Sequence, residues 1–132
     1  MVIEINTLNT SPIYEQLRDQ IVLGIAAKKL ALGESLPSVR RLAADLGINF
    51  HTVNKAYSML CDEGYIAMDR RKGAVIAQTE ESGEAFALEL ADKLTMSAAE
   101  AICHKVTESE FLAICKQCYK DAGGNLENGG SK

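Results

Sequence analysis

LPSVRRLAADLGINFHTVNKAY, residues 36–57, is the stretch that decides the fold. Apolar residues recur at the i, i+3, i+4, i+7 spacing of a helix face, once before Gly47 and once after it. The two sets are Val39, Leu42, Ala43 and Leu46, then Val53, Ala56, Tyr57 and Leu60. Ser38 and Asn49 stand where the N-caps of these helices belong. The stretch predicts two short helices joined by a tight turn, which is a helix-turn-helix.

Polar side chains gather on the outer faces of these two helices. Arg40 and Arg41 open the first helix. The start of the second helix carries Asn49, His51, Thr52, Asn54 and Lys55. The N-terminal residues of the second helix of a helix-turn-helix meet base edges in the major groove, where Asn can pair with adenine. An αα-hairpin with merely solvated polar residues has the same spacing, so the spacing leaves both interpretations open.

A β-hairpin pattern follows Gly64, which is placed to end the second helix. Apolar runs at 65–68 and 74–77 flank the charged turn Asp69-Arg70-Arg71-Lys72-Gly73. Directly after a helix-turn-helix, such a hairpin is a wing. Its three consecutive cations suit phosphates or the narrow minor groove of A·T-rich DNA, although a solvated hairpin tip has the same composition.

Three segments carry a family resemblance: SPIYEQLRDQI (11–21), GESLPSVRRLAADLGINFHTVNKAYSMLCDEGYI (33–66) and RRKGAVIA (70–77). Together they resemble the winged-helix domain of GntR-family bacterial transcription regulators, and the short C-terminal region resembles the YtrA subfamily. The resemblance implies that Arg40 contacts phosphate or base. Phe50 departs from the pattern, since many relatives carry Arg or another polar residue there. We expect the following DNA-binding residues: Ser38, Arg40, Arg41, Asn49, Phe50, His51, Thr52, Asn54, Lys55, Arg70, Arg71, Lys72 and Gly73.

The segment before the helix-turn-helix is expected to be structural. Ser11-Pro12 predicts a helix start with Ser11 as the N-cap, followed by the stripe Ile13, Leu17, Ile21 and Ile25. The polar residues of this helix are interpreted as solvated surface: Glu15, Gln16, Arg18, Asp19 and Gln20. Val2, Ile3 and Ile5 alternate and suggest a short edge strand. Residues 30–36 are interpreted as a connection.

Charge is distributed unevenly along the 132 residues, whose net charge is −4. Residues 1–79 hold nine Lys/Arg against eight Asp/Glu, whereas residues 80–132 hold five against ten. The acidic excess therefore lies outside the predicted winged helix, and local field matters more for DNA binding than net charge. With 47% hydrophobic residues, the chain suits one compact domain plus a small appendage.

Residues 80–122 predict two helices. One continuous apolar stripe predicts a single helix over 81–105, although Ser97 and Glu100 could form a capping box that starts a new one. Thr107 and Glu110 predict a capping box for the second helix, and Gly123-Gly124 ends it. Two such helices cannot cover their own apolar faces, so we expect residues 80–122 to form a homodimerisation element and 123–132 a disordered tail. The expected dimer contacts are Phe86, Leu90, Leu94, Ile102, Phe111, Cys115 and Tyr119.

The cysteines could suggest another chemistry. Cys115 and Cys118, with Cys103 and His104, could form a metal site or redox switch, but Cys is often buried, so we expect reduced thiols packed in the core. We predict no bound metal, no cofactor and no enzyme activity. The sequence has neither an apolar run long enough to span a membrane nor a secretion signal, so we expect a cytoplasmic protein without a membrane partner.

These patterns predict a mainly α fold with a small β-hairpin: a winged helix-turn-helix, residues 1–79, plus a short C-terminal helical dimerisation element. The predicted function is sequence-specific transcription regulation by a repressor that binds a pseudo-palindromic double-stranded DNA operator as a homodimer. Two alternatives stay open: a winged-helix protein-interaction module with an acidic partner, and a metal- or thiol-responsive regulator. The residues do not identify an effector.

Overall fold

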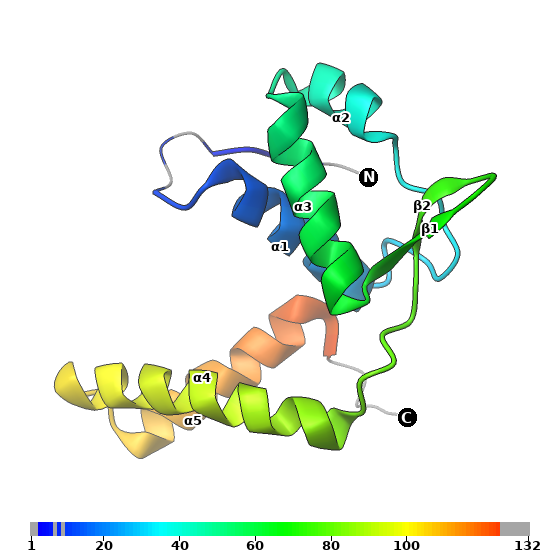
Figure 1. Cartoon of the computed structure of the whole chain (residues 1–132). Helices are drawn as coiled ribbons and strands as arrows, with labels where there is room; N and C mark the ends of the chain where they lie inside the picture. The colour runs from blue at the N-terminus through cyan, green and yellow to red at the C-terminus, as the bar shows by residue number, and fades with distance from the viewer. Residues whose placement is uncertain (1–2, 7, 9, 125–132) are drawn as a thin grey trace. The chain divides into compact units, whose positions relative to one another are not determined.

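The computed structural model describes residues 3–6, 8 and 10–124, and the chain divides after Thr79 into two units. The first unit holds helices α1 (Ile13–Ala26), α2 (Val39–Leu46) and α3 (Phe50–Glu63) and the hairpin of β1 (Ile66–Asp69) and β2 (Gly73–Ile76) (Figure 1). The second unit holds α4 (Gly83–Cys103), α5 (Glu108–Tyr119) and a closing π-helical turn, Lys120–Gly124. The predicted fold class, a winged helix-turn-helix in a mainly helical chain, is confirmed.

The core of the first unit is built from the predicted stripes. Leu17 and Ile21 of α1 are fully buried against Val53 and Leu60 of α3. Burying side chains of this size contributes about 1.5–3 kcal/mol each. The remaining buried residues come from the segment between α1 and α2, from α2 and α3, and from the hairpin: Leu30, Leu36, Leu42, Ala43, Ala56, Tyr57, Ile66, Ala74 and Ile76. One core therefore fixes all three helices and the hairpin relative to one another.

The two helices of the helix-turn-helix begin and end as their sequence predicts. Ser38 Oγ accepts a hydrogen bond from the backbone N–H of Arg41 at 3.1 Å. Asn49 Oδ1 accepts one from the N–H of His51 at 2.7 Å. Gly47, with φ of 68°, adopts the left-handed conformation that stops α2 at little steric cost. The turn and both caps are therefore local properties of this stretch.

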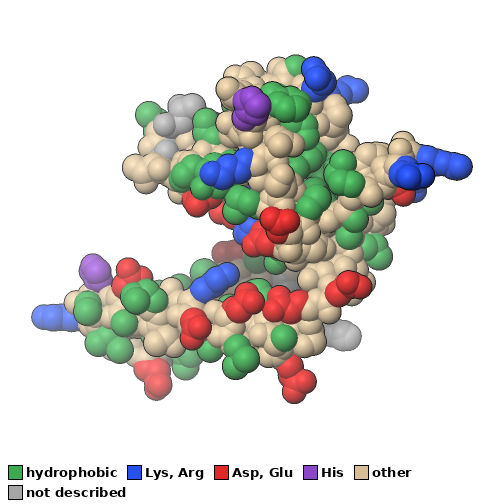
Figure 2. Space-filling view, in the orientation of Figure 1, with side chains coloured by type: hydrophobic (Ala, Val, Ile, Leu, Met, Phe, Trp, Pro, Cys, Tyr) green, Lys and Arg blue, Asp and Glu red, His purple; other side chains and the backbone are tan. Residues whose placement is uncertain are grey.

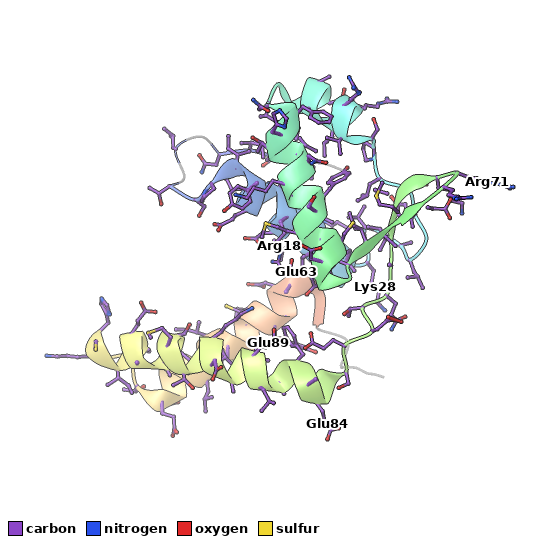
Figure 3. The ribbon with its side chains drawn as sticks, in the orientation of Figure 1. Arg18, Lys28, Glu63, Arg71, Glu84 and Glu89 are labelled. Carbon is purple, nitrogen blue, oxygen red and sulfur yellow. The ribbon has the colours of Figure 1, made fainter. Side chains whose placement is uncertain are left out.

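Arg18 joins α1 to α3, which corrects its interpretation as solvated surface. Its Nε and Nη2 donate to the two carboxylate oxygens of Glu63 at 2.9 and 3.1 Å, and Nη1 donates to Asp19 at 2.9 Å (Figure 3). The guanidinium carbon lies 5.6 Å from the centre of the Tyr65 ring. Hydrogen bonds to Glu63 raise the pKa of Arg18, so this side chain stays charged in the fold.

The start of the chain also differs from the prediction. The described residues 3–6 form no strand, and their backbone bonds instead to α1 side chains. Gln20 Oε1 accepts from Glu4 N–H at 2.9 Å, and Gln16 Oε1 accepts from Asn6 N–H at 3.0 Å. The predicted strand was therefore wrong over these residues, since glutamines replace a strand partner; Val2 lies outside the described part. Pro12, rather than Ser11, is the N-cap of α1.

Residues 30–36, which were predicted to be a simple connection, contain a third extended segment that pairs with the wing. Strands β1 and β2 pair antiparallel, with Ile66 opposite Ile76. Along the other edge of β2, the N–H groups of Gly33 and Leu36 donate to the carbonyls of Ile76 and Ala74, both at 2.8 Å. Ile76 N–H donates back to Glu34 O at 2.9 Å. The segment before α2 thereby fixes the wing to the helix-turn-helix.

In the second unit, α4 runs uninterrupted from Gly83 to Cys103, which confirms one helix rather than a new start near Ser97. Thr107 and Glu110 form the predicted reciprocal capping box of α5. Over their described residues, 83–103 and 108–119, neither helix contains a buried residue. No helix in the described part of the chain is both long and apolar enough to cross a bilayer. The predicted tail lies outside the described residues from 125 onward.

Candidate nucleic-acid interface

The predicted contact residues come from three places in the first unit: the start of α2, the start of α3 and the tip of the wing. Most of these side chains are exposed, and Thr52 and Gly73 are half-buried. Figure 2 shows Lys and Arg side chains gathered at the α2 end of this unit and at the hairpin tip. These groups belong to one compact unit built on a shared core, so they can act on one ligand together.

Two of the predicted DNA contacts, Ser38 and Asn49, also act as helix caps. Ser38 and Asn49 each use a side-chain oxygen to cap a helix, at 3.1 Å for Ser38 and 2.7 Å for Asn49. A bidentate pair with adenine needs both the oxygen and the NH₂ group of an Asn side chain. The Oδ1 atom that would accept from adenine already accepts from the N–H of His51, so the pair would have to share this oxygen with the cap or displace the cap. Backbone N–H groups at the exposed helix starts that the caps do not use can contact phosphate.

Arg40, Phe50 and His51 form a cluster between α2 and α3. The guanidinium carbon of Arg40 lies 5.5 Å from the centre of the Phe50 ring, and the His51 ring meets Phe50 edge-on at 5.6 Å. Both distances fall within the range of favourable cation–π and aromatic contacts. The aromatic ring therefore restrains Arg40 beside the first residue of α3.

Arg41 has a weaker partner. Its Nε lies 3.7 Å from Asp45 Oδ2 one turn further along α2, and the two side chains are 77% and 59% exposed. An ion pair this long and this exposed is worth a few tenths of a kcal/mol. Arg41 can therefore leave Asp45 for a phosphate at little cost.

Lys55 contacts a residue that the sequence did not single out. Its Nζ lies 4.0 Å from the centre of the Tyr14 ring, in the first turn of α1. This cation–π contact places the ammonium group over α1 and restrains it. Tyr14 is thus a positioning residue for the candidate interface. No spacing rule connects residues 41 positions apart, so only the folded structure reveals the pair.

The turn at the wing tip is stabilised by hydrogen bonds between its own backbone and the Asp69 side chain. Asp69 Oδ1 accepts hydrogen bonds from the N–H groups of Lys72 and Arg71 at 2.9 and 2.8 Å. These bonds lower the pKa of Asp69, with the bond from Lys72 the larger cause. Gly73 has a φ of 76°, which closes the hairpin. With the carboxylate held against the turn backbone, Arg71 projects outward at the tip (Figure 3).

The second unit presents the residues predicted for dimer contact. Phe86, Phe111 and Cys115 are half-buried. The others are exposed by 41% at Leu90, 42% at Leu94, 72% at Ile102 and 71% at Tyr119. Apolar side chains of this size lose favourable burial when they face water. This unit therefore keeps a substantial apolar surface open within a single chain.

Cys61 packs against the core of the first unit, but Cys103, Cys115 and Cys118 fill no core within one chain, so the prediction of core packing was wrong for these three. Cys103 and Cys118 are exposed, Cys61 and Cys115 are half-buried, and all four are free thiols. Two helices without a buried residue offer Cys103 and Cys118 no interior to occupy. Burial, together with the nearby Asp62 carboxylate, raises the pKa of Cys61. Among the described residues, no group of three His, Cys, Asp or Glu side chains could hold a metal ion.

Comparison with known proteins bears on the role of this geometry. Residues 10–76 match the family model for bacterial regulatory proteins of the gntR family. The uncharacterized HTH-type transcriptional regulator YhcF of Bacillus subtilis is 34% identical over 100 residues, which cover 76% of this chain and 79% of YhcF. The HTH-type transcriptional repressor YtrA of the same organism is 38% identical over 77 residues, covering 58% of this chain and 59% of YtrA.

A solved structure matches both units. The crystal structure titled transcriptional antiterminator from Listeria monocytogenes EGD-e has a TM-score of 0.84 and 31% identity, and the match covers 94% of each chain. These relatives support a DNA-binding regulator and not a protein-interaction module. The chain belongs to the GntR family of bacterial transcription regulators, in its YtrA subfamily, and its winged helix-turn-helix is a DNA-binding domain.

Proposed function

We propose that this chain is a transcriptional repressor that binds a pseudo-palindromic operator as a homodimer. One observation carries the proposal: the start of α3, with Phe50 and His51 exposed, lies in the same compact unit as the cations of α2 and of the wing tip. The first turn of a recognition helix meets base edges, and flanking cations hold the phosphates on either side.

Each group in the interface then has a distinct role. The base-facing positions are Phe50, His51, Thr52 and Asn54 at the start of α3. Ser38 and Asn49 stabilise the helix starts and direct backbone N–H groups at phosphates. Arg40, Arg41 and Lys55 supply positive charge beside the major groove. Arg70, Arg71 and Lys72, with the turn at Gly73, contact phosphates or the minor groove.

The second unit supplies the two-fold symmetry. An isologous pair of α4–α5 units would cover the apolar side chains that a single chain leaves in water, and this gain favours association. A two-fold dimer would present two recognition helices to successive major grooves, roughly 34 Å apart along the DNA. The operator would then be a pseudo-palindrome with one half-site for each wing and recognition helix.

Repression is the simplest outcome of such binding. A dimer seated across two major grooves of a promoter would block access of RNA polymerase to the same DNA. The curated relative YtrA of Bacillus subtilis is named a repressor, which supports the same direction of regulation for this chain. We propose no cofactor for this activity, because the proposed contacts come from the chain's own side chains and backbone N–H groups.

The test is fluorescence anisotropy with the purified full chain. Three duplexes are compared: the DNA upstream of its own gene, a duplex recovered from a random pool, and a scrambled control. A dimer that neutralises about six phosphates should lose about a thousandfold in affinity between roughly 50 and 200 mM salt. Strong preference for one duplex over the scrambled control is expected as well. Equal, weak binding to every duplex would contradict operator recognition.

A further inference from the structure

Phe50 is an exposed aromatic residue in an unusual place. It is the first residue of α3 and is 41% exposed, whereas Val53 and Tyr57 of the same helix are 0% and 4% exposed. The exposed part of an aromatic ring contributes nothing to the stability of the domain. Its position coincides with the turn that meets base edges in the proposed complex.

The neighbours of Phe50 hold the ring rather than cover it. Arg40 lies 5.5 Å from the ring centre, and the edge-on ring of His51 lies 5.6 Å away. Both neighbours are exposed polar residues that can themselves reach DNA. The ring is therefore an apolar spot between two hydrogen-bonding groups, restrained on two sides and open to solvent for the rest.

The major groove offers few apolar groups for such a ring. Each base pair presents hydrogen-bond donors and acceptors there, and the prominent apolar group is the C5-methyl of thymine. A phenyl ring cannot donate or accept a conventional hydrogen bond, so it distinguishes bases chiefly through that methyl. A guanidinium beside it suits a neighbouring guanine or phosphate.

We infer that Phe50 recognises the C5-methyl group of a thymine in each operator half-site, next to the base or phosphate contacted by Arg40. This inference rests on the proposed function. It makes Phe50 a specificity-determining residue. It also predicts that one position of each half-site requires thymine for its C5-methyl group and not for its base pairing.

The test replaces thymine by deoxyuridine, which removes the methyl group and leaves every hydrogen-bonding group in place. The probe is the duplex that wild-type full-length protein selects from a random pool, together with copies carrying deoxyuridine at single thymine positions. At one thymine position of each half-site, the replacement should weaken wild-type binding by about fourfold, as expected for one buried methyl. Phe50→Ala should bind the two forms of that position equally.

Two further variants control the experiment. Leu23→Ala removes a side chain that is 52% exposed on α1, outside the candidate interface, and should keep the wild-type response to deoxyuridine. Phe50→Leu keeps an apolar side chain and should keep part of the response. Circular dichroism melting of each variant checks that the fold survives.

The possible failures are distinguishable. If the selected duplex binds tightly but no deoxyuridine copy weakens wild-type binding, the inference about Phe50 is overturned while operator recognition stands. Phe50→Ala discriminating as strongly as wild type would also overturn it, because another residue would then contact the methyl. Recovery of no preferred duplex at all would overturn the proposed function and this inference with it.

Discussion

Arg18 of α1 and Glu63 of α3 are joined by two parallel N–H···O bonds of 2.9 and 3.1 Å. The pair links the first helix of the winged helix to the last turn of its recognition helix. Such bidentate geometry is the most favourable one for an Arg–carboxylate pair. The two side chains are 22% and 40% exposed, so water still screens the interaction.

Replacing Arg18 should lower stability modestly. We expect Arg18→Ala to reduce the free energy of unfolding by about 1 kcal/mol, measured by urea denaturation followed by circular dichroism. Arg41→Ala is the matched control, because its pair with Asp45 is long and exposed, and we expect no change beyond a few tenths of a kcal/mol. Equal losses in the two variants would show that the geometry of the Arg18 pair is unimportant.

Tyr57 should make the domain sensitive to alkaline pH. Its hydroxyl donates to Pro37 O at 2.7 Å, and burial raises the pKa of Tyr57 to about 12 from its ordinary value of 10.0. Because the folded-state pKa is raised, the stabilisation is fully present below pH 10.0 and is lost as pH rises through about 12. Tyr57→Phe should cost about 1 kcal/mol at neutral pH.

The pH profile separates this effect from general alkaline unfolding. In urea denaturation, the stability advantage of wild type over Tyr57→Phe should shrink and then reverse as the pH rises from 10.0 toward 12, since only wild type loses the contribution of a protonated phenol. A constant difference between the two proteins across this range would contradict the assignment.

Local signals made much of this fold predictable. Ser38, Gly47 and Asn49 specify their helix ends within a few residues, and the turn from Asp69 to Gly73 does the same for the wing. The pairs that were missed connect distant positions, as Arg18 with Glu63 and Lys55 with Tyr14 do. Neither pair produces a periodic pattern, so the sequence alone could not reveal them.

Residue type alone does not assign a role where one type serves two purposes. Asn49 has the chemistry of an adenine contact, but the same oxygen caps α3. The cysteines were expected in a core because of their usual preference for burial, yet α4 and α5 have no interior within one chain over their described residues. Assigning such residues requires knowing which partners the fold brings near them.

Arg40 should contribute strongly to operator binding. We expect Arg40→Ala to weaken binding by about 1–3 kcal/mol without unfolding the domain, because Arg40 is exposed and its removal leaves the core intact. Anisotropy titrations on the selected duplex provide the measurement. Lys29→Ala removes an exposed cation outside the candidate interface and should bind like wild type. Wild-type affinity in Arg40→Ala would show that this contact is wrongly assigned.

Arg71 at the wing tip should act on all duplexes alike. Asp69 ties the turn backbone, so Arg71→Ala should remove a charge without changing the shape of the hairpin. We expect weaker binding to operator and scrambled DNA by similar factors, and a salt slope reduced by about 1. A loss confined to the operator, with an unchanged salt slope, would instead assign Arg71 to base recognition.

The apolar stripe of α4 should control both association and DNA binding. Leu94 is 42% exposed and lies on the predicted dimer face, whereas Met96, which is 64% exposed, lies about 200° around the helix axis. Leu94→Glu would place a charge in the proposed interface, where its desolvation opposes pairing. We expect this variant to sediment as a monomer and to lose most operator affinity, while its winged helix keeps the wild-type circular dichroism signature.

Met96→Glu adds the same charge outside the predicted stripe and should remain dimeric. If Met96→Glu disrupts the dimer and Leu94→Glu does not, the interface lies on the opposite side of α4. If the wild-type protein is a monomer and still binds its operator tightly, operator binding does not require a dimer.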